Sequence, residues 1–175
     1  MSYALIAVRA PKTEVQAALN TLSRRADLLE ENGYTVVKDH ALAAQDLLTV
    51  LYSGVESDLE KLARELSLSL KVAVFATLNF DNEVLAFFAL SSGVLVSQYN
   101  SSPNYLACST TPPTAENVAE LAALFGKPEN AHAIIQLLGR KRGLGFSNEL
   151  QRHEQLAALL GLPRSSVDGK VSSVA

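Results

Sequence analysis

Residues 71–99 read KVAVFATLNFDNEVLAFFALSSGVLVSQY. Two turn signals, at residues 79–82 and 91–93, divide this stretch into three runs rich in β-branched and apolar side chains. Such short connections join antiparallel neighbours, so the stretch predicts a three-stranded meander. Val84 to Leu90 is apolar almost without interruption, which predicts a strand covered on both faces by helices.

The residues before this stretch predict alternating strands and helices. Apolar residues at three- and four-residue spacing after Thr13 favour a helix that Thr13 caps and Gly33 ends. A second helix is expected from Ser57, because Glu60 stands three residues on, as in a capping box. The other elements expected here are strands at 3–8, 34–37 and 47–52 and a short helix at 40–45.

The residues after the meander predict a long loop followed only by helices. Pro103, Pro112 and Pro113 interrupt residues 100–114. Three helices are then expected, at 115–125 with Thr114 as cap, at 131–138, and at 148–160 with a stop at Gly161 and Pro163. The strand-rich and helical halves are thus separate in sequence, which is typical of an α+β fold with a mixed or antiparallel sheet.

The length of 175 residues suits a single domain with one hydrophobic core. We expect this domain to span residues 1–163. Residues 164–175 are serine-rich and follow a stop signal, so we expect a flexible C-terminal tail there.

Composition narrows the environment and the partners. The formal net charge of -3 offers no cationic excess for nucleic acid or anionic lipid. No apolar run approaches the roughly 20 residues that a membrane helix requires. Cys108 is the single cysteine, which favours a reducing compartment. We therefore expect a cytoplasmic protein that binds neither nucleic acid nor membrane.

The most distinctive stretch for recognition follows the last strand of the meander. We expect Tyr99, Asn100, Ser101 and Tyr105 to form a binding surface, because tyrosine gives contact area with little entropy loss. A structural alternative is that Asn100 and Ser101 satisfy backbone groups at the strand end. In that case the two tyrosines pack over the edge of the core.

Two features suit a small hydrolase or transferase. Cys108 lies among hydroxyl residues and becomes a nucleophile if His132 or His153 folds against it; otherwise it is a buried thiol. The Gly-rich loop 139–145 carries three consecutive basic residues, so its amides suit an anion, although a solvated loop between two helices is the favoured interpretation.

The sequence predicts no metal site and no cofactor. Its three histidines, His40, His132 and His153, are far apart in the chain, and none has a second histidine or a cysteine at ligand spacing.

Residues 99–105 (YNSSPNY), 152–157 (RHEQLA) and 160–163 (LGLP) resemble those of a loose group of bacterial proteins of unknown function. The resemblance covers about the C-terminal half and implies a bacterial cytoplasmic domain, with no activity attached. Together with the residues above, it leads to a hypothesis: a non-catalytic binding module whose partner is another protein or a second copy of the chain. The alternative is the small hydrolase or transferase that uses Cys108 or the loop 139–145.

Overall fold

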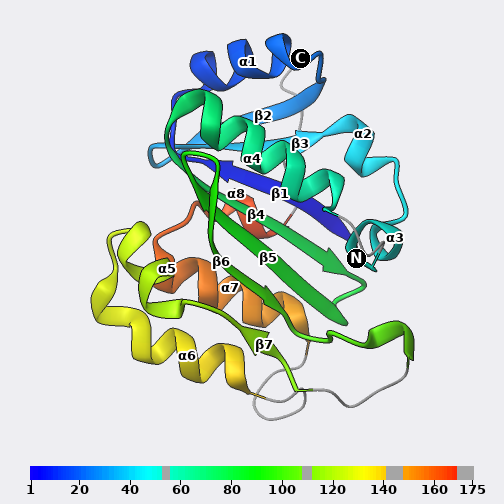
Figure 1. The fold of residues 1–175 in the computed structure, drawn as a ribbon, viewed down its shortest axis with the longest axis vertical. Coiled ribbons are helices and arrows are strands. Elements are labelled where there is room, and N and C mark those ends of the chain that lie inside the picture. The colour runs from blue at the N-terminus through cyan, green and yellow to red at the C-terminus, as the bar shows by residue number, and fades with distance from the viewer. Residues whose placement is uncertain (53–55, 108–111, 141–147, 169–175) are drawn as a thin grey trace.

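The computed structural model describes residues 1–52, 56–107, 112–140 and 148–168 (Figure 1). The strands are β1 (Tyr3–Val8), β2 (Ala26–Glu31), β3 (Tyr34–Asp39), β4 (Ala73–Phe80), β5 (Val84–Ser91), β6 (Val94–Asn100) and β7 (Thr114–Ala115). The helices are α1 (Lys12–Thr21), α2 (His40–Ala43), α3 (Leu47–Tyr52), α4 (Asp58–Leu70), α5 (Val118–Leu124), α6 (Ala131–Gly139), α7 (Glu149–Leu160) and α8 (Ser165–Asp168). Two short 3-10 helices are η1 (Tyr105–Ala107) and η2 (Pro128–Asn130).

All strands form one antiparallel sheet in the order β2-β3-β1-β4-β5-β6-β7. The predicted meander is confirmed as β4, β5 and β6. Its turns lie at Asp81-Asn82 and Ser92-Gly93, where all four residues have positive φ angles. That backbone matches the twist of paired strands, so these turns place the strands side by side. The α+β class is confirmed.

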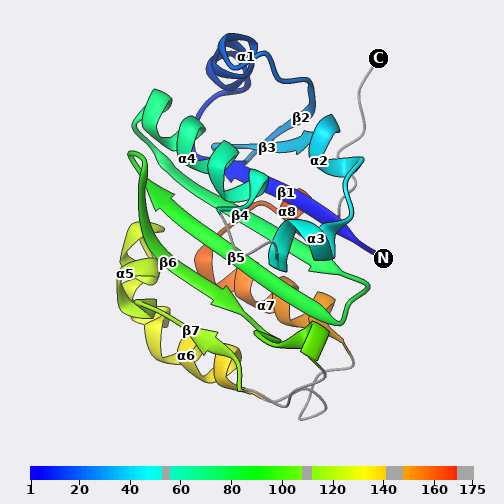
Figure 2. The same cartoon turned by 45° about the vertical axis from the view of Figure 1, so that its right-hand side comes forward.

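Helices cover both faces of the sheet, and the chain order decides which face each helix covers (Figures 1 and 2). Helices α1 to α4 pack with one face in a cluster that includes Ile6, Leu62 and Val74. Helices α5 to α8 pack with the other face in a cluster that includes Phe75 and Phe87. The protein therefore has an apolar layer on each side of the sheet rather than the one core that we expected. None of the described helices is long and apolar enough to cross a membrane.

The predicted helix from Thr13 to Gly33 is wrong in its second half. Helix α1 ends at Thr21, and β2 forms a hairpin with β3 through Asn32-Gly33, where φ is 53° and 79°. An Asn-Gly pair is a strong signal for this hairpin turn. The helix-like spacing of Leu22 and Ala26 was therefore fortuitous. Thr13 does not cap α1, because Pro11 holds the N-cap position without a side-chain bond.

The predicted strand at 47–52 is helix α3. Asp46 explains the difference, because its carboxylate accepts hydrogen bonds from the Leu48 amide at 3.1 Å and from the Thr49 hydroxyl at 3.1 Å. A carboxylate that caps the first turn in this way favours a helix. The short helix expected at 40–45 is confirmed as α2.

Two of the expected helix ends are confirmed, and one expected cap is wrong. The Ser57 hydroxyl accepts from the Glu60 amide at 3.1 Å at the start of α4, as predicted. Asn148 caps α7, and Gly161 ends it with φ of 69°. Thr114 does not cap α5, because Thr114–Ala115 form β7 and Asn117 takes the N-cap position. In the described residues after β6, the regular elements are thus helices except for this two-residue strand.

The expected flexible tail is not confirmed in its first residues. Residues 165–168 form α8, and Val167 is only 4% exposed in the apolar layer of the C-terminal helices. The Ser165 amide also donates to the Glu31 carboxylate at 3.1 Å, which ties α8 to β2. Apolar periodicity does not detect a segment this short. Residues 169–175 lie outside the described residues.

Candidate functional site

Tyr99, the first of the expected binding residues, belongs to the interior. Its side chain is 3% exposed, and its ring stacks on Phe87 with centroids 5.6 Å apart. The hydroxyl donates to the Leu138 carbonyl at 3.1 Å and accepts from the Arg152 guanidinium at 2.9 Å. Burial raises the pKa of Tyr99, so the phenol stays protonated. These contacts correspond to the structural alternative for this residue.

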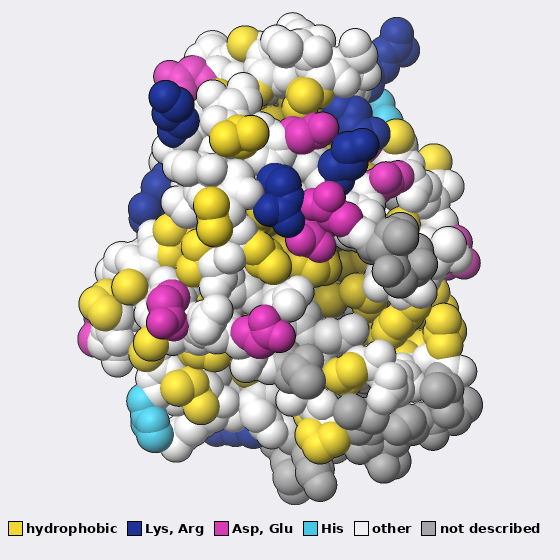
Figure 3. Space-filling view, viewed as in Figure 1, with side chains coloured by type: hydrophobic (Ala, Val, Ile, Leu, Met, Phe, Trp, Pro, Cys, Tyr) yellow, Lys and Arg dark blue, Asp and Glu magenta, His cyan; other side chains and the backbone are white. Residues whose placement is uncertain are grey.

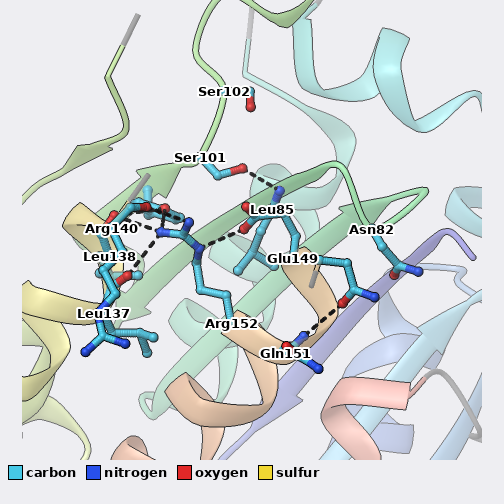
Figure 4. Close-up of polar contacts among 12 residues, drawn as sticks. Asn82, Leu85, Ser101, Ser102, Leu137, Leu138, Arg140, Glu149, Gln151 and Arg152 are labelled. Atoms are coloured by element: carbon cyan, nitrogen blue, oxygen red, sulfur yellow. Dashed lines mark hydrogen bonds and ion pairs between the residues drawn. The ribbon is translucent and has the colours of Figure 1, made fainter. Parts of the chain in front are cut away.

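Asn100 and Ser101 organise the end of β6. The Ser101 hydroxyl accepts from the Leu85 amide at 2.9 Å, and the Ser101 amide donates to the Leu85 carbonyl at 2.9 Å (Figure 4). The Asn100 side chain accepts from the Ser102 amide at 2.8 Å. Both side chains therefore satisfy backbone groups where the strand ends, again as the structural alternative states.

Tyr105 lies in η1 and is half-buried. Its hydroxyl donates to the Glu83 carboxylate at 2.6 Å, and its ring meets Phe80 edge-on at 6.2 Å between centroids. The structure thus holds Tyr105 against the β4–β5 turn, away from Tyr99, whose ring packs with the C-terminal helices. The four expected residues do not form one exposed surface.

A buried arginine missed in the sequence organises the interior next to Tyr99. Arg152 is 1% exposed, and its guanidinium pairs with the Glu149 carboxylate at 2.9 Å. It also donates to the backbone carbonyls at the end of α6, namely Leu137 at 3.1 Å, Leu138 at 3.1 Å and Arg140 at 2.7 Å (Figure 4). A cation suits this position, because the C-terminal carbonyls of a helix carry partial negative charge. The cluster joins β6, α6 and α7 and has a structural role.

The residues proposed for catalysis are only partly described. Cys108 and residues 141–147 of the basic loop lie outside the described residues. His132 is exposed and contacts Gln136, whereas His153 is fully buried with Nδ1 2.7 Å from the Tyr3 hydroxyl. The described residues contain no group of three side chains able to hold a metal ion.

The strongest candidate site is a groove on the opposite face of β6 from Tyr99's ring. It has a volume of about 390 Å³. We call it the β6 groove, and its lining residues are Leu51, Tyr52, Phe88, Gln98, Tyr99, Asn100, Pro103 and Glu116. Phe88 and Leu51 are half-buried at the border of the apolar layer under α4. Phe88 pairs with Gln98 across β5 and β6, so the two share this face of the sheet.

The groove exists because the two faces of the sheet are covered unequally. On one face α5 contacts β6, α6 contacts β7 and α7 contacts β5. On the other face α4 lies over β4 and β5, and beyond it the figure shows an apolar surface over β5 and β6 with acidic side chains along its lower border (Figure 3).

Hydrogen bonds hold the polar walls of the β6 groove in place. The Glu116 amide donates to the Gln98 carbonyl at 3.1 Å, and the Gln98 side-chain amide donates to the Glu116 carboxylate at 3.1 Å. On the α3 side, the Tyr52 hydroxyl donates to the Ser102 carbonyl. Burial raises the pKa of Tyr52, which keeps this donor protonated. Glu116 is thus an exposed carboxylate held at a fixed place beside an apolar floor.

No protein family, curated protein or solved structure matches the chain.

Proposed function

We propose that this chain is a non-catalytic binding module of the bacterial cytoplasm and that it binds another protein in the β6 groove. The observation that carries the proposal is the groove beside the part of the β5–β6 face that α4 covers, with Phe88 and Leu51 half-buried in its lining. Contiguous apolar surface next to a polar rim is typical of protein interaction sites.

The construction of the groove favours binding with little ordering cost. Phe88 and Gln98 stand on paired strands, and Glu116 is fixed by backbone and side-chain hydrogen bonds to Gln98. A partner therefore meets a surface that is already organised, and less conformational entropy is lost on association. Of the four binding residues expected from the sequence, Tyr99 and Asn100 line this groove, whereas Ser101 and Tyr105 do not.

The three histidines have separate partners in the structure: His40 bonds to Asp27 at 3.0 Å, His132 to Gln136, and His153 to Tyr3. The alternative activity through Cys108 or loop 139–145 stays a prediction, and loss of function in Cys108→Ser would support it.

Capture by the immobilised full chain from a lysate of its source cells tests the proposal. Gln98→Arg fills the groove with a longer cation, whereas Gln136→Arg makes the same change at an exposed position of α6. A protein identified by mass spectrometry should bind the wild type and Gln136→Arg and be lost from Gln98→Arg. Titration of that purified protein should reproduce the loss. Partners that bind all three folded chains equally would place recognition elsewhere.

A further inference from the structure

We infer that the β6 groove selects a partner segment in which an apolar side chain lies within three residues of a lysine or arginine. This inference rests on the proposed function and adds the chemistry of the partner. Its basis is that the groove combines an apolar floor with a single fixed negative charge.

The described groove has a net negative lining. Among its eight lining residues, Glu116 carries the only formal charge, and its side chain is exposed. Arg64 of α4, which donates to the Gly93 carbonyl at 2.8 Å before β6, is already paired with Glu56 at 2.6 Å and with Glu60 at 2.8 Å. The positive charge of Arg64 is thereby neutralised. The Glu116 carboxylate lines the groove and accepts a hydrogen bond from the neutral side-chain amide of Gln98 at 3.1 Å. A cationic partner side chain complements this arrangement, and an anionic one opposes it.

The spacing between floor and carboxylate follows from the sheet. Phe88 and Gln98 are direct partners on β5 and β6, and the Glu116 backbone bonds to Gln98 on the outer side of β6. Strands lie about 4.8 Å apart, so the Phe88 and Glu116 backbones are separated by roughly 10 Å. An extended peptide advances about 3.3 Å per residue. A residue that contacts Phe88 and a basic residue that reaches Glu116 are therefore one to three positions apart.

A library of random 12-residue peptides displayed on phage tests the inference. The library is panned at low ionic strength against the full chain, and clones that also bind Gln98→Arg are discarded. Selected peptides should carry lysine or arginine within three residues of Leu, Ile, Met or Phe. Synthetic copies are then titrated against the wild type and Glu116→Gln by fluorescence anisotropy, each also with its basic residue changed to glutamine.

A double-mutant cycle separates charge pairing from other effects. Each single change, Glu116→Gln or the peptide substitution, should weaken binding up to about fivefold, the range of a partly exposed ion pair. The second change made on top of the first should have little further effect. Glu129→Gln removes an equal charge from an exposed position in η2 and should leave affinity unchanged. Higher salt should weaken wild-type binding and affect Glu116→Gln less.

The experiments distinguish failure of the basic-segment inference from failure of the proposed binding function. Peptides that depend on the groove but lack a basic residue, or show no coupling to Glu116, overturn this inference and leave the binding module standing. If no peptide is selected, the inference is also wrong. If, in addition, Gln98→Arg abolishes the capture of no protein from the lysate, the proposed function is wrong as well. Sedimentation velocity that shows a dimer abolished by Gln98→Arg would identify a second copy as the occupant and overturn the basic-segment inference.

Discussion

At the scale of single residues, His153 is a histidine kept neutral by its surroundings. Its side chain is fully buried, and Nδ1 lies 2.7 Å from the Tyr3 hydroxyl, which also accepts from the Asn79 amide at 3.4 Å. The Tyr3 hydroxyl and Nδ1 therefore share one hydrogen bond in the interior, and the histidine tautomer sets its direction. Burial lowers the pKa of His153 to about 3, so protonation opposes folding.

The resulting prediction is a pH dependence of stability that depends on His153. The unfolded chain takes up the proton near pH 6.5, whereas the folded chain does so only near pH 3, so the contribution is complete above pH 6.5 and is lost as the pH falls. The loss approaches about 1.4 kcal/mol per pH unit. Urea unfolding of wild type and His153→Gln from pH 7 to 4 measures it. The variant should lose stability less steeply, while exposed His132→Gln should follow the wild type; equal slopes for all three would mean that buried His153 is protonated.

At the scale of elements, the β2–β3 hairpin depends on the backbone conformation of its turn. Gly33 has φ of 79°, and a Cβ added there would meet no atom within 4 Å, so any cost of a side chain comes from the backbone alone. Gly33→Ala should destabilise the fold by about 1–2 kcal/mol, the cost of the left-handed region for an L-residue. Gly139→Ala is the matched control, because Gly139 is also open to solvent but has no positive φ. Denaturant midpoints that shift equally in both would contradict this account.

Elements with a strong local signal could be predicted from the sequence, and those decided by competing local signals could not. The strands at Tyr3–Val8 and in the meander, and the helices from Ser57 and Asn148, combine regular spacing with caps or turns. Residues 22–31 fit helical spacing, but the Asn32-Gly33 turn and pairing with β3 override it. At 47–52 the apolar run suits a strand or a helix equally, and the Asp46 cap decides.

At the scale of the whole molecule, the candidate site depends on a register that the sequence does not reveal. The β5–β6 pairing shifts by one residue at a bulge between Ala89 and Leu90. Because of that shift, Phe88 pairs with Gln98 on the groove face and Tyr99 pairs with Phe87 on the buried face. Without the bulge the faces of Gln98 and Tyr99 would be exchanged relative to β5. The sequence alone did not indicate this register, so it did not show that the Tyr99 ring faces the interior. The groove is also lined by residues of α3 and of the segment after β7, which are distant in sequence.

Helix α8 near the C-terminus bonds to β2 and packs in the apolar layer of the C-terminal helices. We therefore expect that its removal lowers the stability of the fold. Removal of residues 165–175 deletes buried Val167 and the bond from the Ser165 amide to Glu31. Burial of one valine contributes about 1.5–3 kcal/mol, and 1 kcal/mol shifts the Tm of a domain of this size by roughly 2–4 °C. We therefore expect the Tm to fall by about 3–12 °C in calorimetry.

Removal of residues 169–175 alone is the matched control, and it should leave the Tm within about 1 °C because terminal residues of a domain usually contribute little to its stability. The substitution Val167→Ser in the full chain should reproduce most of the loss caused by the longer truncation, since it removes the buried side chain and keeps the backbone bond of Ser165. If both truncations leave the Tm unchanged, α8 does not stabilise the fold. If both lower it equally, the stabilising contacts come from residues beyond Asp168, and the contribution assigned to Val167 is wrong.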